Sequence, residues 1–226
     1  MIDLPHHDDL YSLRRRKMVE RQIVPRGVGD PLVLEAMREI PREIFVEEAL
    51  RGQAFADNAL PIGHGQTISQ PYIVARMTEI LQVGRNDRIL EVGTGTGYQT
   101  ALLARLAGRV YSIERVPALA EKALANLHWL GFDNVEIRVG DGSVGWPDRA
   151  PFDRILVAAA APAVPPSLLA QLAPNGRLVI PVGDARVQML TIVTRTADGL
   201  IERRDEGCVF VRLIGEEGWP EERREE

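Results

Sequence analysis

The sequence predicts an α/β fold: a doubly wound, mostly parallel seven-stranded sheet with helices on both faces, a C-terminal antiparallel hairpin and an N-terminal helical cap. Three observations lead to this fold. Short apolar segments alternate with longer helical patterns from residue 88 onward, a glycine-rich turn follows the first apolar segment, and a turn at Asp198 and Gly199 joins the last two. Alternation implies parallel strands covered by helices, whereas a short turn implies an antiparallel pair.

The expected elements follow from the hydrophobic pattern and from the residues that begin and end each segment. Helices are expected at 98–107, 117–130 and 165–172, and strands at 88–93, 109–114, 135–139, 153–159, 176–182, 187–195 and 207–213.

The N-terminal part contains helical segments and one long irregular stretch. Helices are expected at 13–22, at 31–39 after the N-cap Asp30, and from Pro71 to about residue 82, with Ser69 or Gln70 as its N-cap. The basic residues 14–17 are interpreted as a solvated helix face. Residues 55–72 lack periodicity but are rich in turn formers, and a loop of this length inside a compact domain is usually functional.

Length and composition predict one domain, residues 1–226. It divides into an extension (1–16), a helical cap with an active-site loop (17–83), a cofactor-binding core (84–214) and a tail (215–226). The net charge of −5 offers no basic surface for nucleic acid. No apolar stretch is long enough to span a membrane, and a single cysteine, Cys208, predicts a reduced cytoplasmic setting.

The glycine turn indicates the kind of ligand. Gly93, Gly95 and Gly97 are spaced G-x-G-x-G, whereas a dinucleotide-binding turn is spaced G-x-G-x-x-G. Glu91, two residues earlier, would repel a pyrophosphate but suits a ligand with an ammonium group, such as S-adenosylmethionine. A dehydrogenase is therefore disfavoured, and binding of NAD without S-adenosylmethionine would restore that reading.

Two further strand ends carry carboxylates. Glu114 lies about 20 positions after the glycine turn, the spacing expected of a carboxylate that accepts the ribose hydroxyls; the alternative is a role in starting the next helix. Asp141, between Gly140 and Gly142, could accept from the adenine amino group, or could belong to an ordinary turn.

Other chemistries find little support in the sequence. Residues 158–162 are apolar and lack the polar and aromatic side chains that hold an extruded base. The four histidines show no metal-ligand spacing, and Cys208 is interpreted as an inert thiol in a strand.

Several motifs together resemble the protein-L-isoaspartate O-methyltransferases. They are LPIG at 60–63, GQTISQP at 65–71, LEVGTGTGY at 90–98, GDG at 140–142, FDRI at 152–155 and GRLVIPVG at 176–183, and the resemblance spans residues 17–219. It implies methyl transfer from S-adenosyl-L-methionine to the free α-carboxylate of L-isoaspartyl residues in damaged proteins, which starts repair through a succinimide. It also implies isoaspartyl peptides and proteins as partners, no nucleic acid or membrane partner, and a monomer.

The resemblance also implies roles for individual residues. Ser69 has the catalytic-site role and is expected to orient the substrate carboxylate or the loop. The implied cofactor-binding residues are Gln66, Thr67, Ile68, Glu91, Gly93, Thr94, Gly95, Gly97, Glu114, Arg115, Asp141 and Gly142, with no metal ligand. A carboxylate acceptor is already ionised at neutral pH, so that its methylation requires positioning and exclusion of water but no general base.

One position departs from the family pattern. The family usually has a Val-Pro-Leu-type strand near the C-terminus, whereas residues 209–213 read VFVRL, with Arg212 in place of proline. This affects the expected grip on the substrate. Two other readings stay open: a class I methyltransferase for another acceptor, and a cofactor-binding fold without enzymatic activity that serves as an adaptor.

Overall fold

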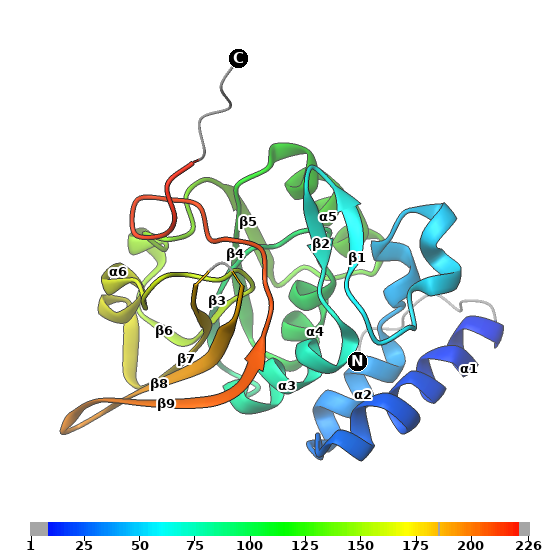
Figure 1. Cartoon of the computed structure of the whole chain (residues 1–226), viewed down its shortest axis with the longest axis horizontal. Helices are drawn as coiled ribbons and strands as arrows, with labels where there is room; N and C mark the ends of the chain where they lie inside the picture. Colours follow the sequence, from blue (N-terminus) through cyan, green and yellow to red (C-terminus); the bar gives the residue numbers. More distant parts are fainter. Residues whose placement is uncertain (1–8, 185, 222–226) are drawn as a thin grey trace.

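The computed structural model describes residues 9–184 and 186–221, and Figure 1 shows the arrangement of its elements. Seven strands form one sheet in the order β5-β4-β3-β6-β7-β8-β9. The strands β3 to β7 are parallel, and β8 and β9 add an antiparallel hairpin at the edge, as predicted. The strands are β3 (Arg88–Val92), β4 (Arg109–Glu114), β5 (Val135–Val139), β6 (Phe152–Val157), β7 (Leu172–Gly183), β8 (Gln188–Thr196) and β9 (Gly199–Cys208).

Helices cover both faces of this sheet. One face packs against α3 (Pro71–Leu81), α4 (Tyr98–Leu106) and α5 (Pro117–Trp129), and the other against α6 (Pro166–Ala170). Each face of the sheet has its own hydrophobic core, and successive residues of β3 pack into opposite cores. Ile89 belongs to the core beneath α3, α4 and α5, and Leu90 to the core beneath α6. This alternation is the period of two of a strand that is buried on both faces.

The helical cap lies beside α3 and α4 (Figure 1) and consists of short elements. They are α1 (Asp9–Met18), a π-helical turn (Val19–Ile23), α2 (Pro31–Glu39) and 3-10 turns at Val24–Arg26, Arg42–Phe45 and Glu48–Gln53; a further 3-10 turn lies at Pro147–Arg149. Asp30 caps α2 as predicted, since its side chain accepts from the N–H groups of Leu32 and Val33. The predicted solvated face at 14–17 is wrong for Arg15, which is buried and pairs with Glu43 at 2.6 Å.

The predicted position of the last strand, 207–213, is wrong. The hairpin turn is so tight that Thr196 pairs with Gly199, and β9 therefore starts at once and ends at Cys208. The charged residues 202–206 do not show the apolar pattern by which strands are predicted. Most side chains of β9 face solvent at the edge of the sheet, where charges are favourable and prevent pairing with a further strand. Residues 209–213 form an extended segment with only an isolated bridge between Arg212 and Ala160.

Two further boundaries differ from the prediction. The helix expected at 165–172 ends at Ala170, because Leu172 already pairs with Phe152 in the sheet. The irregular stretch 55–72 contains a small hairpin, β1 (Leu60–Gly63) and β2 (Gln66–Ile68), which is separate from the main sheet. The sequence also predicts a loose polar lead-in at residues 1–10 and a solvated tail at 221–226. Asp9 and Leu10 instead belong to α1, and residues 1–8 and 222–226 lie outside the described residues.

Candidate active site

A cavity lies at the carboxyl ends of β3 and β4, where open α/β sheets bind ligands. This main cavity encloses about 890 Å³ of empty space, part of it open to solvent. It brings together predicted residues from four distant segments: Gln66, Thr67, Ile68, Ser69, Gly93, Thr94, Gly95, Glu114, Arg115 and Gly142. Glu91, Gly97 and Asp141 do not line it, and their predicted roles in cofactor binding stay predictions.

The glycine turn forms one wall of the main cavity. Gly93, Gly95 and Gly97 have φ values of 93°, 57° and 98°, a region that residues with a Cβ rarely adopt. A Cβ on Gly142 would overlap the side chain of Val92, so that this position needs glycine for a close approach of β5 and β3. The backbone can therefore face a ligand directly.

Glu114 connects the end of β4 with this turn. Its Oε2 accepts from the N–H of Gly95 at 2.8 Å, and its Oε1 accepts from the N–H of Val116 at 2.9 Å. A carboxylate has about four acceptor sites, and hydroxyl donors from a ligand can add to these two bonds. The two readings of Glu114, helix start and ligand acceptor, are thus compatible.

Glu91 is fully buried beneath the turn. Its Oε2 accepts from Thr100 and Ser112, each at 2.6 Å, and the Ser112 hydroxyl in turn lies 2.6 Å from that of Thr94. Burial raises the pKa of Glu91 to about 7, although the two hydroxyl donors oppose this increase. Its Oε1 is buried without a hydrogen-bond partner, a vacancy that suits the positively charged group of a bound ligand.

Asp141 holds two loops together. Its Oδ1 accepts from the N–H and hydroxyl of Ser143, and its Oδ2 accepts from the N–H of Glu216 at 2.8 Å. Partial burial raises the pKa of Asp141, but the bonds from Glu216 and Ser143 outweigh it and hold the pKa below its ordinary value. In this structure Asp141 joins the β5 turn to the C-terminal segment.

Ser69 lies between β2 and α3. Of the two predicted N-caps of α3, Ser69 and Gln70, it is Gln70 that occupies the N-cap position, without a capping hydrogen bond from its side chain. The carbonyl oxygen of Ser69 accepts from Arg42 Nη2 at 2.7 Å. The Ser69 hydroxyl makes no hydrogen bond with the described residues. The hydroxyl is therefore available to a ligand in the cavity.

Arg42 is a buried residue that sequence reasoning missed. It is fully buried, also donates from Nε to the carbonyl oxygen of Ala54 at 2.7 Å, and lies over the ring of Tyr98 at 4.7 Å. Burial lowers the pKa of Arg42, and Tyr98 and Asp57 oppose this decrease. The only sequence signal was an arginine directly after Pro41, which is not distinguishable from a surface arginine.

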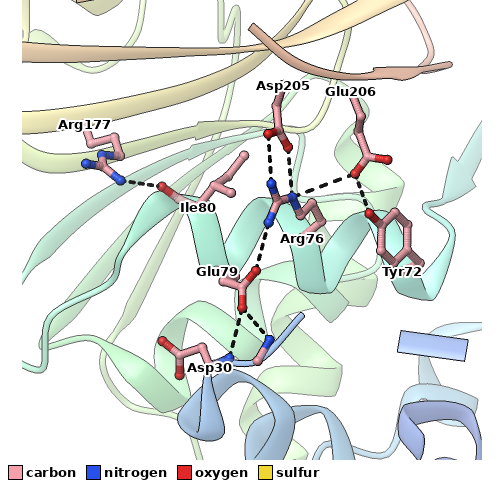
Figure 2. A network of polar contacts seen from close by, with 9 residues as sticks. Asp30, Tyr72, Arg76, Glu79, Ile80, Arg177, Asp205 and Glu206 are labelled. Atoms are coloured by element: carbon pink, nitrogen blue, oxygen red, sulfur yellow. Dashed lines mark hydrogen bonds and ion pairs between the residues drawn. The ribbon is translucent and has the colours of Figure 1, made fainter. Parts of the chain in front are cut away.

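A polar network surrounds α3, the helix that follows Ser69 (Figure 2). Arg76 in α3 donates to both carboxylate oxygens of Asp205 at 2.8 Å and to Glu79 at 3.0 Å. Glu79 accepts from the N–H groups of Gly29 and Asp30 in the helical cap. Bonding to Asp205 raises the pKa of Arg76, despite its partial burial. The network thus joins the cap, α3 and the end of β9.

The segment after β9 closes the main cavity on another side. Val211, Arg212, Leu213 and Ile214 line it. The bridge to Ala160 uses the carbonyl oxygen of Val211 and the N–H of Leu213. Because the N–H of residue 212 takes no part in this bridge, proline and arginine are both compatible with it.

Residues 9–184 and 186–221 show neither a metal site nor a membrane-spanning helix. No cluster of His, Cys, Asp and Glu side chains there could hold a metal ion. Within the same residues, no helix is long and apolar enough to cross a membrane.

The fold and the cavity define a class I methyltransferase that uses S-adenosylmethionine. The residues fit this cofactor: the glycine turn exposes backbone, Glu114 has spare acceptor sites, and Glu91 Oε1 lacks a partner near the turn. The protein-L-isoaspartate(D-aspartate) O-methyltransferase family model matches residues 13–218. The chain belongs to this family.

Individual proteins similar to this chain carry the same family name. Protein-L-isoaspartate O-methyltransferase of Trichlorobacter lovleyi is 54% identical over 210 residues, which cover 92% of this chain and 97% of that protein. Protein-L-isoaspartate O-methyltransferase 1 of Syntrophobacter fumaroxidans is 55% identical over 209 residues, with coverage of 92% and 98%. A solved β-aspartate methyltransferase from Plasmodium falciparum, in complex with S-adenosyl-L-homocysteine, has a TM-score of 0.76 and 28% identity, covering 88% of this chain and 98% of that one.

Proposed function

We propose that this protein transfers a methyl group from S-adenosylmethionine to the free α-carboxylate of L-isoaspartyl residues in peptides and proteins. The observation that carries the proposal is the position of Ser69, whose unbonded hydroxyl lies in the same cavity as the glycine turn. The ester formed collapses to a succinimide, which opens partly to normal aspartate.

The chemistry requires little of the protein beyond positioning. A carboxylate with a pKa of about 4 is ionised at neutral pH and acts as the nucleophile without a base. The bound cofactor supplies an electrophilic methyl group on a sulfonium. Ser69 donates to the substrate carboxylate, Ile62 and Ile68 exclude water, and Gln66 and Thr67 line the cofactor side.

The cofactor-binding roles form part of the same proposal. Glu114 accepts from the ribose hydroxyls, with Arg115 beside it. Gly142 and Asp141 lie on the adenine side. Glu91, buried beneath the glycine turn, attracts the ammonium group. Gly93, Thr94, Gly95 and Gly97 form the turn around the methionine part. The geometry of Glu114 and the partnerless Oε1 of Glu91 support these roles.

The oligomeric state, the compartment and the partners are part of the same proposal. We expect a monomer in the cytoplasm, with damaged proteins as its partners and no nucleic-acid or membrane partner. The single cysteine, Cys208, agrees with a reducing compartment.

The direct test uses labelled S-adenosylmethionine and two peptides that differ only in containing L-isoaspartate or aspartate. Base-labile label on the isoaspartyl peptide alone is the expected result. Binding of S-adenosylhomocysteine without label on either peptide would contradict the proposed acceptor and favour another class I methyltransferase activity.

A further inference from the structure

Two further cavities adjoin the main cavity, and their charged side chains differ. The side cavity shares Ser69 with the main cavity and contains Arg26, Asp57 and Glu206. The outer cavity shares Gln66, Arg115, Val211, Arg212 and Ile214 with it, and encloses about 1000 Å³, largely open to solvent. The described residues of the outer cavity thus include two arginines, and its one carboxylate, Glu221, belongs to the C-terminal segment.

The extended segment after β9 connects these cavities. Val209 lines the side cavity, whereas Val211 and Arg212 line both the main and the outer cavity. A peptide that runs along this segment with its reacting residue at Ser69 therefore extends toward the side cavity in one direction and toward the outer cavity in the other. Only one flank of the peptide meets Arg212.

The protein's own chain shows what the outer cavity accepts. Glu221 places its carboxylate 2.8 Å from Arg115 Nη1, although 75% of the Glu221 side chain is exposed. An acidic side chain on an extended, proline-preceded segment already pairs with a cation of this cavity. Arg212 adds a second cation, at the position where the family usually has proline, and its guanidinium lies 5.5 Å from the ring of Trp219.

We propose that the outer cavity binds an acidic side chain that flanks the isoaspartyl residue on one side, with Arg212 as the specificity-determining residue and Arg115 beside it. The inference rests on the proposed function. Arginine suits this role because its planar donors match a carboxylate. Glu221 competes for the same place. The side cavity, with Asp57 and Glu206, gives no such preference to the opposite flank.

The test compares isoaspartyl peptides with Glu, Gln or Lys placed one to three residues before or after the isoaspartate. We expect kcat/KM to be about three- to tenfold higher for Glu than for Lys on one flank only, as for partly exposed ion pairs, and to converge in high salt. Arg212→Gln should abolish the difference, because it retains the backbone N–H and removes the charge. Arg203→Gln, an exposed arginine of β9, is the matched control and should retain it.

Further results distinguish failure of this inference from failure of the proposed function. Glu221→Gln should raise kcat/KM for the Glu peptide, and an unchanged or lower value would overturn competition by Glu221. Equal kcat/KM for Glu and Lys peptides on both flanks would overturn the charge preference while leaving the repair activity intact. Absence of transfer to every isoaspartyl peptide would instead contradict the proposed function.

Discussion

The guanidinium of Arg42 donates from Nη2 to the carbonyl oxygen of Ser69 at 2.7 Å, from a position with no exposure to solvent. The same group lies over the ring of Tyr98, which begins α4 directly after the glycine turn. Burial of a cation without a carboxylate partner is costly, and among the described residues the carbonyl oxygens of Ser69 and Ala54 and the ring of Tyr98 offset that cost for Arg42. Arg42 is a positioning residue that links the acceptor loop with the cofactor side.

Arg42→Met should therefore lower transfer more than its effect on folding explains. We expect kcat/KM for an isoaspartyl peptide to fall about 100-fold, because displacement of a positioned group by about 1 Å has effects of that order. Affinity for S-adenosylhomocysteine should change little. Arg15→Met is the matched control, since Arg15 is also buried but donates to Glu43 and to the carbonyl oxygen of Arg38 and not to Ser69. Equal losses of transfer in the two variants would show that Arg42 has only a structural role.

The Arg76–Asp205 pair should control the mobility of the segment after β9. In Arg76→Gln we expect faster hydrogen exchange at residues 207–214 and a higher KM for the peptide, with about 1 kcal/mol lost from the free energy of unfolding. Arg105→Gln provides the comparison, because Arg105 of α4 is about as exposed as Arg76 but pairs with Glu39 of α2, at 2.9 Å. Unchanged exchange at 207–214 in Arg76→Gln would disprove the link.

Glu91 should make the stability depend on pH. Its folded-state pKa of about 7 lies above the ordinary 4.5, so that the folded protein binds the proton more tightly than the unfolded chain does. The contribution of Glu91 is fully present below pH 4.5 and is lost as the pH rises to 7, by about 3 kcal/mol in total.

Glu91→Gln removes this titration. Denaturant unfolding at several pH values should show the variant gaining stability relative to the wild type between pH 4.5 and 7, with a constant difference above. A difference that does not vary with pH would mean that Glu91 is ionised throughout this range.

Ser69→Ala should separate catalysis from stability. Because its hydroxyl has no recorded partner in the folded chain, we expect the free energy of unfolding to change by less than about 0.5 kcal/mol, whereas transfer should fall strongly and cofactor binding should remain. Ser167→Ala should instead lower the free energy of unfolding and leave transfer unchanged, since the Ser167 hydroxyl donates to Glu217 at 2.7 Å outside the main cavity. Wild-type transfer by Ser69→Ala would refute its role.

Glu114→Gln should weaken cofactor binding. The amide keeps one acceptor but loses the charge and the second acceptor, so that we expect the Kd of S-adenosylhomocysteine to rise at least about tenfold, the effect of about 1.4 kcal/mol. Calorimetric titration measures this directly. Thr196→Ala, on the distant hairpin, should leave the Kd unchanged, and an unaltered Kd in Glu114→Gln would place the ribose elsewhere.

The sequence by itself determined the doubly wound sheet, the position of the main cavity and ten of the residues that line it. Strand periodicity and the G-x-G-x-G spacing are local signals, and parallel topology then brings Gly93, Glu114 and Gly142 to one sheet edge. Only the tertiary structure decided the place of the charged strand β9, the burial of Arg15 and Arg42, and the hydrogen bonds that Glu91 and Asp141 accept within the folded chain. Several of these features depend on partners far along the chain, such as Ala54, 12 residues from Arg42, and Glu216, 75 residues from Asp141. An edge strand can be polar and a buried arginine looks like any other, because burial depends on what packs against a residue and not on its neighbours in sequence.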